Sequence, residues 1–273
     1  MQSTNQVVIV TGASSGIGEA TAQKLAAEGY QVYGGARSFE DSLKQYNGFK
    51  TLYLDLSDSD SVKHFVSIVY ADAGRVDVLI NNAGSAIMGA IEDTSIDQAQ
   101  KIFDVNVFGW QRIMQEVLPI MRKQNSGKIL NVTSIAGIFG LPFRGWYSAS
   151  KSALESLAES IRYEVEPFNI QVCSIRPGDV KTNIGAHRLV AEKGDQSAYS
   201  GVFTKHRNKI DADVNHGIST EFIANKLYKI LQRKRLPTVA VIGNTLQQIA
   251  AGSYSVIPYR MFHWIIKKNY DLE

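Results

Sequence analysis

The chain has a single cysteine, Cys173, in 273 residues, so no disulfide bond can form within it. A lone thiol suits a reducing compartment, and we therefore expect a cytoplasmic protein. Cys173 lies in the apolar run from 170 to 175, where a buried and inert thiol is more common than a nucleophile.

Excess charge, metal-ligand spacing and long apolar runs are also lacking. The formal net charge of +3 is too small to favour nucleic acid as a partner. No stretch of about eighteen apolar residues and no signal peptide are present, so no membrane-spanning helix is predicted. We expect no metal site, because the histidines have no metal-ligand spacing (His64, His187, His206, His216 and His263).

What the chain does contain is an alternation of short apolar runs with helical patterns. The expected strands are 7–10, 31–33, 51–54, 76–80, 129–132, 170–175 and 238–242, and the expected helices are 19–28, 61–70, 96–121, 147–165 and 220–232. Strands that alternate with helices predict one α/β domain over 1–273, with a doubly wound parallel sheet of about seven strands and helices on both faces.

A glycine-rich loop, Thr11-Gly-Ala-Ser-Ser-Gly-Ile-Gly18, joins the first strand to the first helix. Glycines let the backbone turn sharply and approach a pyrophosphate, and the amides of a helix N-terminus favour an anion. The spacing differs from the commonest dinucleotide fingerprint, G-x-G-x-x-G. The loop therefore indicates a nucleotide site, or merely a tight turn before a helix.

The second strand ends without the acidic residue that binds a ribose hydroxyl pair in many dinucleotide folds. Gly34-Gly35-Ala36-Arg37-Ser38 stands there instead. An arginine can bind a 2′-phosphate that a carboxylate would repel, so Arg37 favours NADP(H) over NAD(H). The alternative is an arginine that simply lies on a surface loop.

Polar residues follow two further strands. Asp55 ends the third strand, where its carboxylate could accept a hydrogen bond from an adenine amino group or cap the next helix. Asn81-Asn82-Ala83-Gly84 ends the fourth strand. Its small residues would let the backbone approach a cofactor, and its asparagines can tie neighbouring strands together.

Tyr147 and Lys151 are four residues apart in a predicted helix, so their side chains share one face. An ammonium beside a phenol favours the phenolate, which predicts a lowered pKa for Tyr147. Such a tyrosine can exchange a proton with a substrate oxygen that the Ser134 hydroxyl holds from a strand end. The alternative is a solvated tyrosine–lysine pair. Asn106, inside the predicted helix 96–121, has either a solvated face or a local role.

Together these motifs resemble the short-chain dehydrogenase/reductase family in its classical form. The resemblance is carried by Thr11-Gly12-x-x-x-Gly16-x-Gly18, Asp55, Asn81-Asn82-Ala83-Gly84, Asn106, Ser134, Tyr147-x-x-x-Lys151 and Pro177-Gly178-x-Val180-x-Thr182. It covers residues 6–182 closely and the remainder loosely. It implies a Rossmann-type fold and an NAD(P)-dependent enzyme acting on CH–OH and C=O groups.

The resemblance also implies roles. Tyr147 would be the general acid in carbonyl reduction and the base in alcohol oxidation, and Lys151 would lower its pKa and hold the nicotinamide ribose. Ser134 would bind the substrate oxygen, and Asn106 would hold a water that relays protons. The expected NADP(H)-binding residues are Gly12, Ser14, Ser15, Gly16, Ile17, Gly18, Arg37, Ser38, Asp55, Leu56, Asn82, Ala83, Gly84, Tyr147, Lys151, Pro177, Gly178, Val180 and Thr182.

The expected substrate is hydrophobic. Gly140-Leu141-Pro142-Phe143-x-x-Trp146 is an apolar and aromatic segment that suits a lipid- or steroid-like carbonyl compound, unless these residues simply pack. Residues 183–218 have a weak, polar pattern after a strand end and are expected to form a mobile substrate lid. An alcohol dehydrogenase working oxidatively and a non-catalytic NADP-binding sensor are the alternatives. Intact Ser134, Tyr147 and Lys151 argue against the sensor.

The C-terminal segment, about 245–273, mixes aromatic and basic residues such as Tyr259, Arg260, Trp264 and Lys267. Such a mixture can seat a helix at a membrane surface, but more often it is a cover that packs on its own domain. We favour the cover and keep peripheral membrane contact as the alternative. Helices around 96–121 and 147–165 often form dimer or tetramer faces in the family, so a homodimer or homotetramer is expected.

Overall fold

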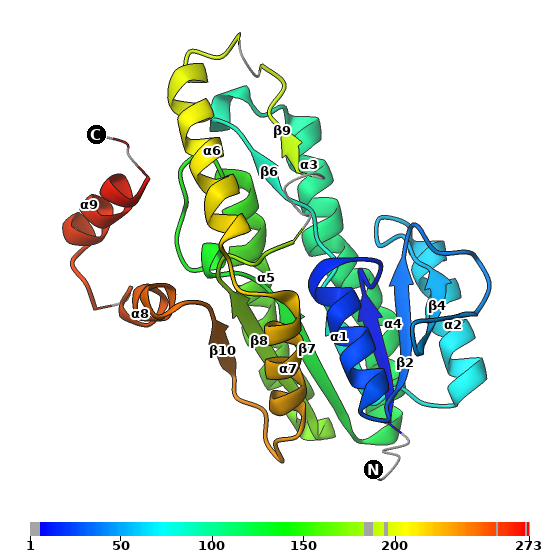
Figure 1. The fold of residues 1–273 in the computed structure, drawn as a ribbon. Coiled ribbons are helices and arrows are strands. Elements are labelled where there is room, and N and C mark those ends of the chain that lie inside the picture. The colour runs from blue at the N-terminus through cyan, green and yellow to red at the C-terminus, as the bar shows by residue number, and fades with distance from the viewer. Residues whose placement is uncertain (1–5, 183–187, 194–195, 255, 271, 273) are drawn as a thin grey trace.

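The computed structural model describes residues 6–182, 188–193, 196–254, 256–270 and 272 (Figure 1). Its main sheet has eight strands in the order β10-β8-β7-β5-β1-β2-β4-β3. The strands are β1 (Val7–Thr11), β2 (Gln31–Ala36), β3 (Lys44–Tyr46), β4 (Phe49–Tyr53), β5 (Val78–Asn81), β7 (Gly127–Val132), β8 (Ile170–Pro177) and β10 (Val239–Ile242). All neighbours pair in parallel except β3, which runs antiparallel to β4 at one edge.

This topology confirms the predicted doubly wound α/β fold. The chain proceeds from β1 through β2 to β4 in one direction, then returns to the other side of β1 and continues through β5, β7, β8 and β10. The strand order therefore reverses between β1 and β5, which is where open sheets of this kind bind ligands.

The predicted count of about seven strands was one short for the main sheet, and a second sheet was not predicted at all. The second sheet pairs β6 (Ile87–Met88) with β9 (Leu189–Val190). The additional strands have two or three residues each, and β3 is exposed along its whole length. Such short segments have too few residues to show an apolar period.

Helices cover both faces of the main sheet. One face carries α1 (Gly16–Ala27) and α7 (Thr220–Leu231), which lie in front of the sheet in Figure 1. The other face carries α2 (Ser59–Ala73), α4 (Gly109–Gln124) and α5 (Gly145–Val165). Successive strand residues point to opposite faces, so β1 contributes apolar side chains to both cores. This explains why the strand is apolar throughout.

The helix predicted over 96–121 is interrupted at its centre. It consists of α3 (Ile96–Phe103), a π-helical segment (Asp104–Phe108) and α4. The side chain of Asn106, inside the π-helical segment, accepts a hydrogen bond from Ser85 N and donates to Ser85 O and Ser150 Oγ, at 2.7 to 3.0 Å. Asn106 therefore has a buried local role and no solvated face.

The segment expected to be a lid contains regular structure that its weak pattern did not predict. It includes β9 and α6 (Ser200–Asn215), while residues 183–187 and 194–195 lie outside the described residues. Short 3-10 helices occur at Ile91–Asp93, Ile135–Gly137 and Glu166–Phe168.

Two helices, α8 (Thr245–Ser253) and α9 (Tyr259–Asn269), follow β10 and extend beyond that edge of the sheet (Figure 1). The Phe262 ring of α9 packs against the Phe139 ring, with 4.8 Å between centroids, and Ile257 and Ile266 join the same cluster. Through these contacts, α9 packs on the rest of the domain. In the described part of the chain, no helix is long and apolar enough to cross a membrane.

Candidate functional site

A cavity of about 960 Å³ lies at the carboxyl ends of the central strands. The structure brings nearly all of the predicted site residues together on its wall: Gly12, Ser14, Ser15, Gly16, Ile17, Arg37, Ser38, Asp55, Leu56, Asn82, Ala83, Gly84, Ser134, Tyr147, Lys151, Pro177, Gly178, Val180 and Thr182. Gly18 and Asn106 are the two predicted residues that do not line it. Asn106 lies behind Ser85, a lining residue that it holds by hydrogen bonds.

Close backbone contacts and hydrogen bonds hold the glycine loop between β1 and the residues that follow β5. Gly12 has a φ of +68°, a conformation that side chains rarely adopt. A Cβ at Gly18 would lie 2.2 Å from Gly12 O, so the start of α1 can approach the loop only as glycine. Asn82 Nδ2 donates to Thr11 O at 3.0 Å and Thr11 Oγ1 accepts from Ala83 N at 3.0 Å. The predicted tying of neighbouring strands by asparagine is confirmed here.

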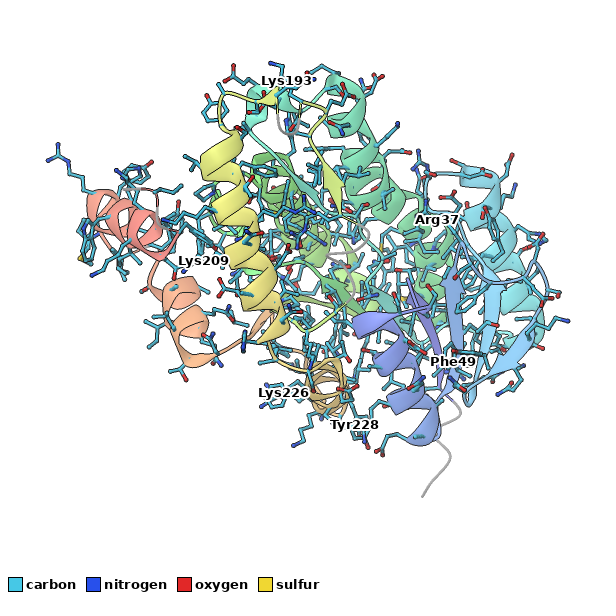
Figure 2. The ribbon with its side chains drawn as sticks, turned by 45° about the horizontal axis from the view of Figure 1, so that its top comes forward. Arg37, Phe49, Lys193, Lys209, Lys226 and Tyr228 are labelled. Atoms are coloured by element: carbon cyan, nitrogen blue, oxygen red, sulfur yellow. The ribbon has the colours of Figure 1, made fainter. Side chains whose placement is uncertain are left out.

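Arg37 lies at the carboxyl end of β2, beside the glycine loop (Figure 2). Its side chain is exposed, and it forms no ion pair or hydrogen bond within the described residues. The Asp55 carboxylate accepts hydrogen bonds from Ser57 N at 2.9 Å and Ser57 Oγ at 2.7 Å, both through Oδ1. The N-cap of α2 is Asp58, so Asp55 does not cap that helix.

Lys151 is buried at the centre of the site. Its Nζ donates to Val132 O at 3.2 Å and lies 5.9 Å from the ring centroid of Tyr147. Burial lowers the pKa of Lys151 to about 8, and the nearby Glu155 carboxylate opposes this shift. Glu155 is itself held by Arg176, with N–O distances of 3.0 and 2.9 Å.

The predicted lowering of the Tyr147 pKa is wrong for this arrangement of side chains. Burial is the largest influence and raises the pKa of Tyr147, while the Ser134 hydroxyl and the Arg144 and Arg188 guanidiniums lower it to a smaller extent. The lysine was expected to act as a nearby point charge. The desolvation of the phenol outweighs all the positive charges around it.

Ser134 follows the end of β7 by two residues, and its side chain forms a hydrogen bond with the phenol of Tyr147. Its side chain accepts a hydrogen bond from Ala136 N at 3.0 Å, which fixes the hydroxyl at the start of a short 3-10 helix. Because the hydroxyl can also donate, it can hold an oxygen atom that Tyr147 reaches as well. Ser134, Tyr147 and Lys151 thus come from one strand end and one helix face, as the sequence predicted.

The expected apolar wall at 140–146 is largely wrong. Leu141 lines the cavity, whereas Phe143 and Trp146 do not. Phe143 packs on Phe203, and Trp146 packs on Phe103, with ring centroids 5.6 and 6.2 Å apart. Much of the apolar wall comes instead from α8 and α9, through Leu246, Ala250, Phe262, Ile265 and Ile266. Apolar residues of other elements, such as Met88, Phe139 and Val214, also line the cavity.

Sequence reasoning also missed a charged group of lining residues, namely Arg144, Asp179, Arg188 and Asp213. They come from the N-terminus of α5, the loop after β8, the residue before β9 and helix α6. Arg144 was within reach of sequence analysis, because it stands three residues before Tyr147 at a helix start. The others are brought to the cavity only by the tertiary fold.

Comparison with known proteins agrees with this geometry. The sequence profile of the short chain dehydrogenases matches residues 6–193. The chain is 36% identical over 268 residues to a 3-ketodihydrosphingosine reductase of Bacteroides thetaiotaomicron, covering 98% of each protein. It is 30% identical over 272 residues to an NADPH-dependent 3-dehydrocapnine reductase of Ornithobacterium rhinotracheale, covering 96% of each.

A solved structure leads to the same family. A short-chain dehydrogenase of Streptomyces avermitilis superposes with a TM-score of 0.79 at 29% identity, covering 95% of this chain and 97% of the other. The chain therefore belongs to the classical short-chain dehydrogenase/reductase family, whose members are oxidoreductases that act on carbonyl or hydroxyl groups with a nicotinamide cofactor.

Proposed function

We propose that this member of the short-chain dehydrogenase/reductase family reduces a hydrophobic, lipid- or steroid-like ketone or aldehyde with NADPH. The observation that carries the proposal is the set of residues that line one cavity. The glycine loop and Arg37 line one part of it, Ser134, Tyr147 and Lys151 another, and the apolar sides of α8 and α9 a third. The names of the two relatives, both reductases of keto or dehydro compounds, support the same direction.

The wall of the cavity fits a nicotinamide dinucleotide phosphate. The backbone at Gly12 and Gly18 is close to its neighbours where a side chain would block approach, and the exposed amides of α1 favour a pyrophosphate. Arg37 presents an uncompensated charge for a 2′-phosphate. Asp55 would hold the adenine, Ala83 and Gly84 the adjacent ribose, and Val180 and Thr182 the carboxamide. The bound cofactor would supply the hydride for reduction.

The proton would come from Tyr147. Its pKa is raised, so the phenol keeps its proton at neutral pH and can donate it to the carbonyl oxygen as that oxygen gains electrons. Ser134 would hold the same oxygen, and Lys151 would hold the cofactor ribose. Asn106 would place a water for proton relay, although its side chain is already engaged with Ser85 and Ser150.

The raised pKa of Tyr147 also favours reduction over the oxidative alternative. Oxidation of an alcohol needs the phenolate as a base, and burial opposes that form. A non-catalytic NADP-binding sensor would not need Ser134, Tyr147 and Lys151 together in one cavity.

The first test is Tyr147→Phe, with Tyr163→Phe as the matched control. Tyr163 lies on the same helix with 68% of its surface exposed, and it does not line the cavity. We expect Tyr147→Phe to reduce NADPH consumption with long-chain ketones by at least about 100-fold, because general acid catalysis contributes about that much. NADPH binding by calorimetry should be nearly unchanged. Turnover that survives in Tyr147→Phe would contradict the proton-donor role.

We also propose partners and a setting. Phe108, directly before α4, and Leu157 of α5 are exposed on the helical layer of α4 and α5, which supports a homodimer or homotetramer through that layer. The exposed apolar and basic residues of α9 support peripheral contact with a membrane. The segment 183–218 would act as the substrate lid. A cytoplasmic location is supported by the single buried thiol of Cys173.

A further inference from the structure

The cavity wall carries both apolar and charged side chains. Leu246, Phe262 and Ile266 of α8 and α9 are among the apolar lining residues. Arg144 and Arg188 are cationic lining residues. A purely hydrophobic substrate would leave two guanidinium groups facing an alkyl chain, which is costly because a desolvated charge needs a partner.

The Arg144 guanidinium has few hydrogen-bond partners among the described residues. Its Nη2 donates to the Tyr270 hydroxyl at 2.7 Å, and its guanidinium carbon lies 5.6 Å from the centroid of that ring. Its Nε is buried and has no hydrogen-bond partner. Within the described residues, no carboxylate lies within 4.0 Å of the guanidinium, so its charge is not neutralised by an ion pair.

Arg188 has 8% of its side chain exposed, and within the described residues it has one ion pair, to Asp211 at 3.1 Å. Its described hydrogen bonds, to Asp211 and the Met88 sulfur, both use Nη1. Arg144 lies close enough to lower the pKa of Arg188, and both guanidiniums lower the pKa of Tyr147. Both positive charges therefore lie near enough to act on the phenol.

The acidic residues of the cavity, Asp179 and Asp213, form no ion pair with either arginine within the described residues. Asp179 accepts a hydrogen bond from Gln247 Nε2 at 2.6 Å. Burial raises the pKa of Asp179, the nearby Arg144 guanidinium lowers it, and Asp213 raises it. The two guanidiniums stay charged at neutral pH.

We propose that Arg144 and Arg188 bind an anionic group of the substrate, a carboxylate, sulfonate or phosphate ester, close to the carbonyl that is reduced. The alkyl part of the same molecule would lie along α8 and α9. The substrate is then an amphipathic oxo compound with a charged head. This inference rests on the proposed function, since it takes the cavity to be the substrate site.

The test compares long-chain oxo acids, with the carbonyl three to five carbons from the carboxylate, with their methyl esters. We expect the wild-type protein with NADPH to prefer the acids by about 10- to 100-fold in kcat/KM, as charge-assisted hydrogen bonds imply. Arg144→Met and Arg188→Met should lose most of this preference by slowing the acids alone. Equal use of acid and ester by the wild-type protein would overturn the inference without any variant, and it would leave the reductase function standing.

Two variants control for other effects. Tyr270→Phe removes the hydrogen bond of Arg144 but keeps its charge, so the acid preference should remain. Lys205→Met removes a positive charge from an exposed position of α6 that does not line the cavity, and it should also retain the preference. A loss as large in Lys205→Met would mean that long-range charge, and not a site at Arg144 and Arg188, selects the acid.

A binding measurement separates the inference from the reaction. Calorimetry with decanoate and with methyl decanoate needs no turnover, so it remains informative if no ketone is reduced. Decanoate should bind the wild-type protein more tightly than its ester, and Arg144→Met should remove the difference. Indistinguishable binding of the two by the wild-type protein would count against the anion site.

Discussion

Burial acts in opposite directions on the two ionisable residues at the centre of the site. It raises the pKa of Tyr147 and lowers that of Lys151 to about 8, because desolvation penalises the charged form of each. A neutral phenol is the form that donates a proton, and a protonated lysine is the form that attracts an electron-rich ribose. Both forms coexist below pH 8, so the site is prepared for reduction at neutral pH.

The protonation of Lys151 predicts the alkaline limb of the pH profile, that is, the fall of kcat/KM for NADPH at high pH. As pH rises through about 8, Lys151 loses its positive charge, while Tyr147 keeps its proton to higher pH. We expect kcat/KM for NADPH, which reports on the free enzyme, to fall about tenfold per pH unit above that point. Initial rates between pH 6 and 10 would measure it.

Lys151→Arg tests whether Lys151 is the group whose titration causes this alkaline limb. Arginine stays charged over the whole range, so the limb should move to higher pH even if the maximal rate is reduced. A limb that stays near pH 8 in Lys151→Arg would show that another group titrates there.

Arg37 is the residue on which cofactor preference depends. Arg37→Asp replaces the exposed guanidinium at the end of β2 with a carboxylate that repels a 2′-phosphate. We expect the ratio of kcat/KM for NADPH to that for NADH to fall by about 10- to 100-fold, as the loss of charge-assisted hydrogen bonds implies.

Lys63→Asp makes the same charge change on an exposed position of α2 that does not line the cavity, and its ratio should not move. If the ratio in Arg37→Asp equals that of the wild-type protein, Arg37 is not part of the phosphate site.

At the scale of elements, the glycine loop leaves no room for a side chain at Gly18. Gly18→Ala would place a methyl group 2.2 Å from Gly12 O, and the loop or α1 would have to shift. We expect a loss of about 1–3 kcal/mol in the free energy of unfolding, as for other overpacked sites, together with weaker NADPH binding. Urea unfolding and calorimetry would measure the two effects.

Gly201→Ala is the matched control. Gly201 lies in α6 with no heavy atom within 4 Å of an added Cβ, so alanine should be neutral or stabilising by up to about 1 kcal/mol. Equal behaviour of the two variants would mean that the contact at Gly18 does not constrain the loop.

The elements also show where sequence reasoning succeeds. Strand ends, the glycine loop and the Tyr147–Lys151 spacing depend on local period and short motifs, and the structure brings them to one cavity. The π-helical segment at Asn106 was visible only as a poor helix residue within a long helical pattern. Local pattern does not encode the side-chain contacts with Ser85 and Ser150 that favour it.

The wall that faces the substrate was less predictable, because its residues come from distant parts of the chain. Trp146 is adjacent to Tyr147 in sequence, yet it points to Phe103 and away from the cavity. Ile266 is more than a hundred residues away from Tyr147 and lines the cavity with it. The raised pKa of Tyr147 has the same origin, since burial depends on what covers a residue and spacing does not report it.

At the scale of the whole molecule, α8 and α9 have two uses. Their inner side lines the cavity, and their outer side exposes large apolar residues, including Ile249 (60%), Tyr259 (75%) and Trp264 (52%). Arg260 and Lys268 are exposed on α9 as well, and the Lys268 ammonium lies 5.0 Å from the centroid of a Trp264 ring. A lipid substrate could then pass from a membrane to the cavity along one pair of helices.

This arrangement predicts binding to anionic membranes. We expect the protein to co-sediment with phosphatidylglycerol vesicles and not with phosphatidylcholine vesicles, and to be released by high salt, because each basic residue near the surface contributes about 1 kcal/mol. Arg260→Glu with Lys268→Glu should abolish sedimentation. Lys226→Glu, on α7 and apart from α9 in Figure 2, should leave it intact. If binding is unchanged by the α9 substitutions, the exposed face of α9 does not meet the membrane and is better explained as a contact between copies of the chain, which sedimentation equilibrium of the same variants would detect as a change in mass.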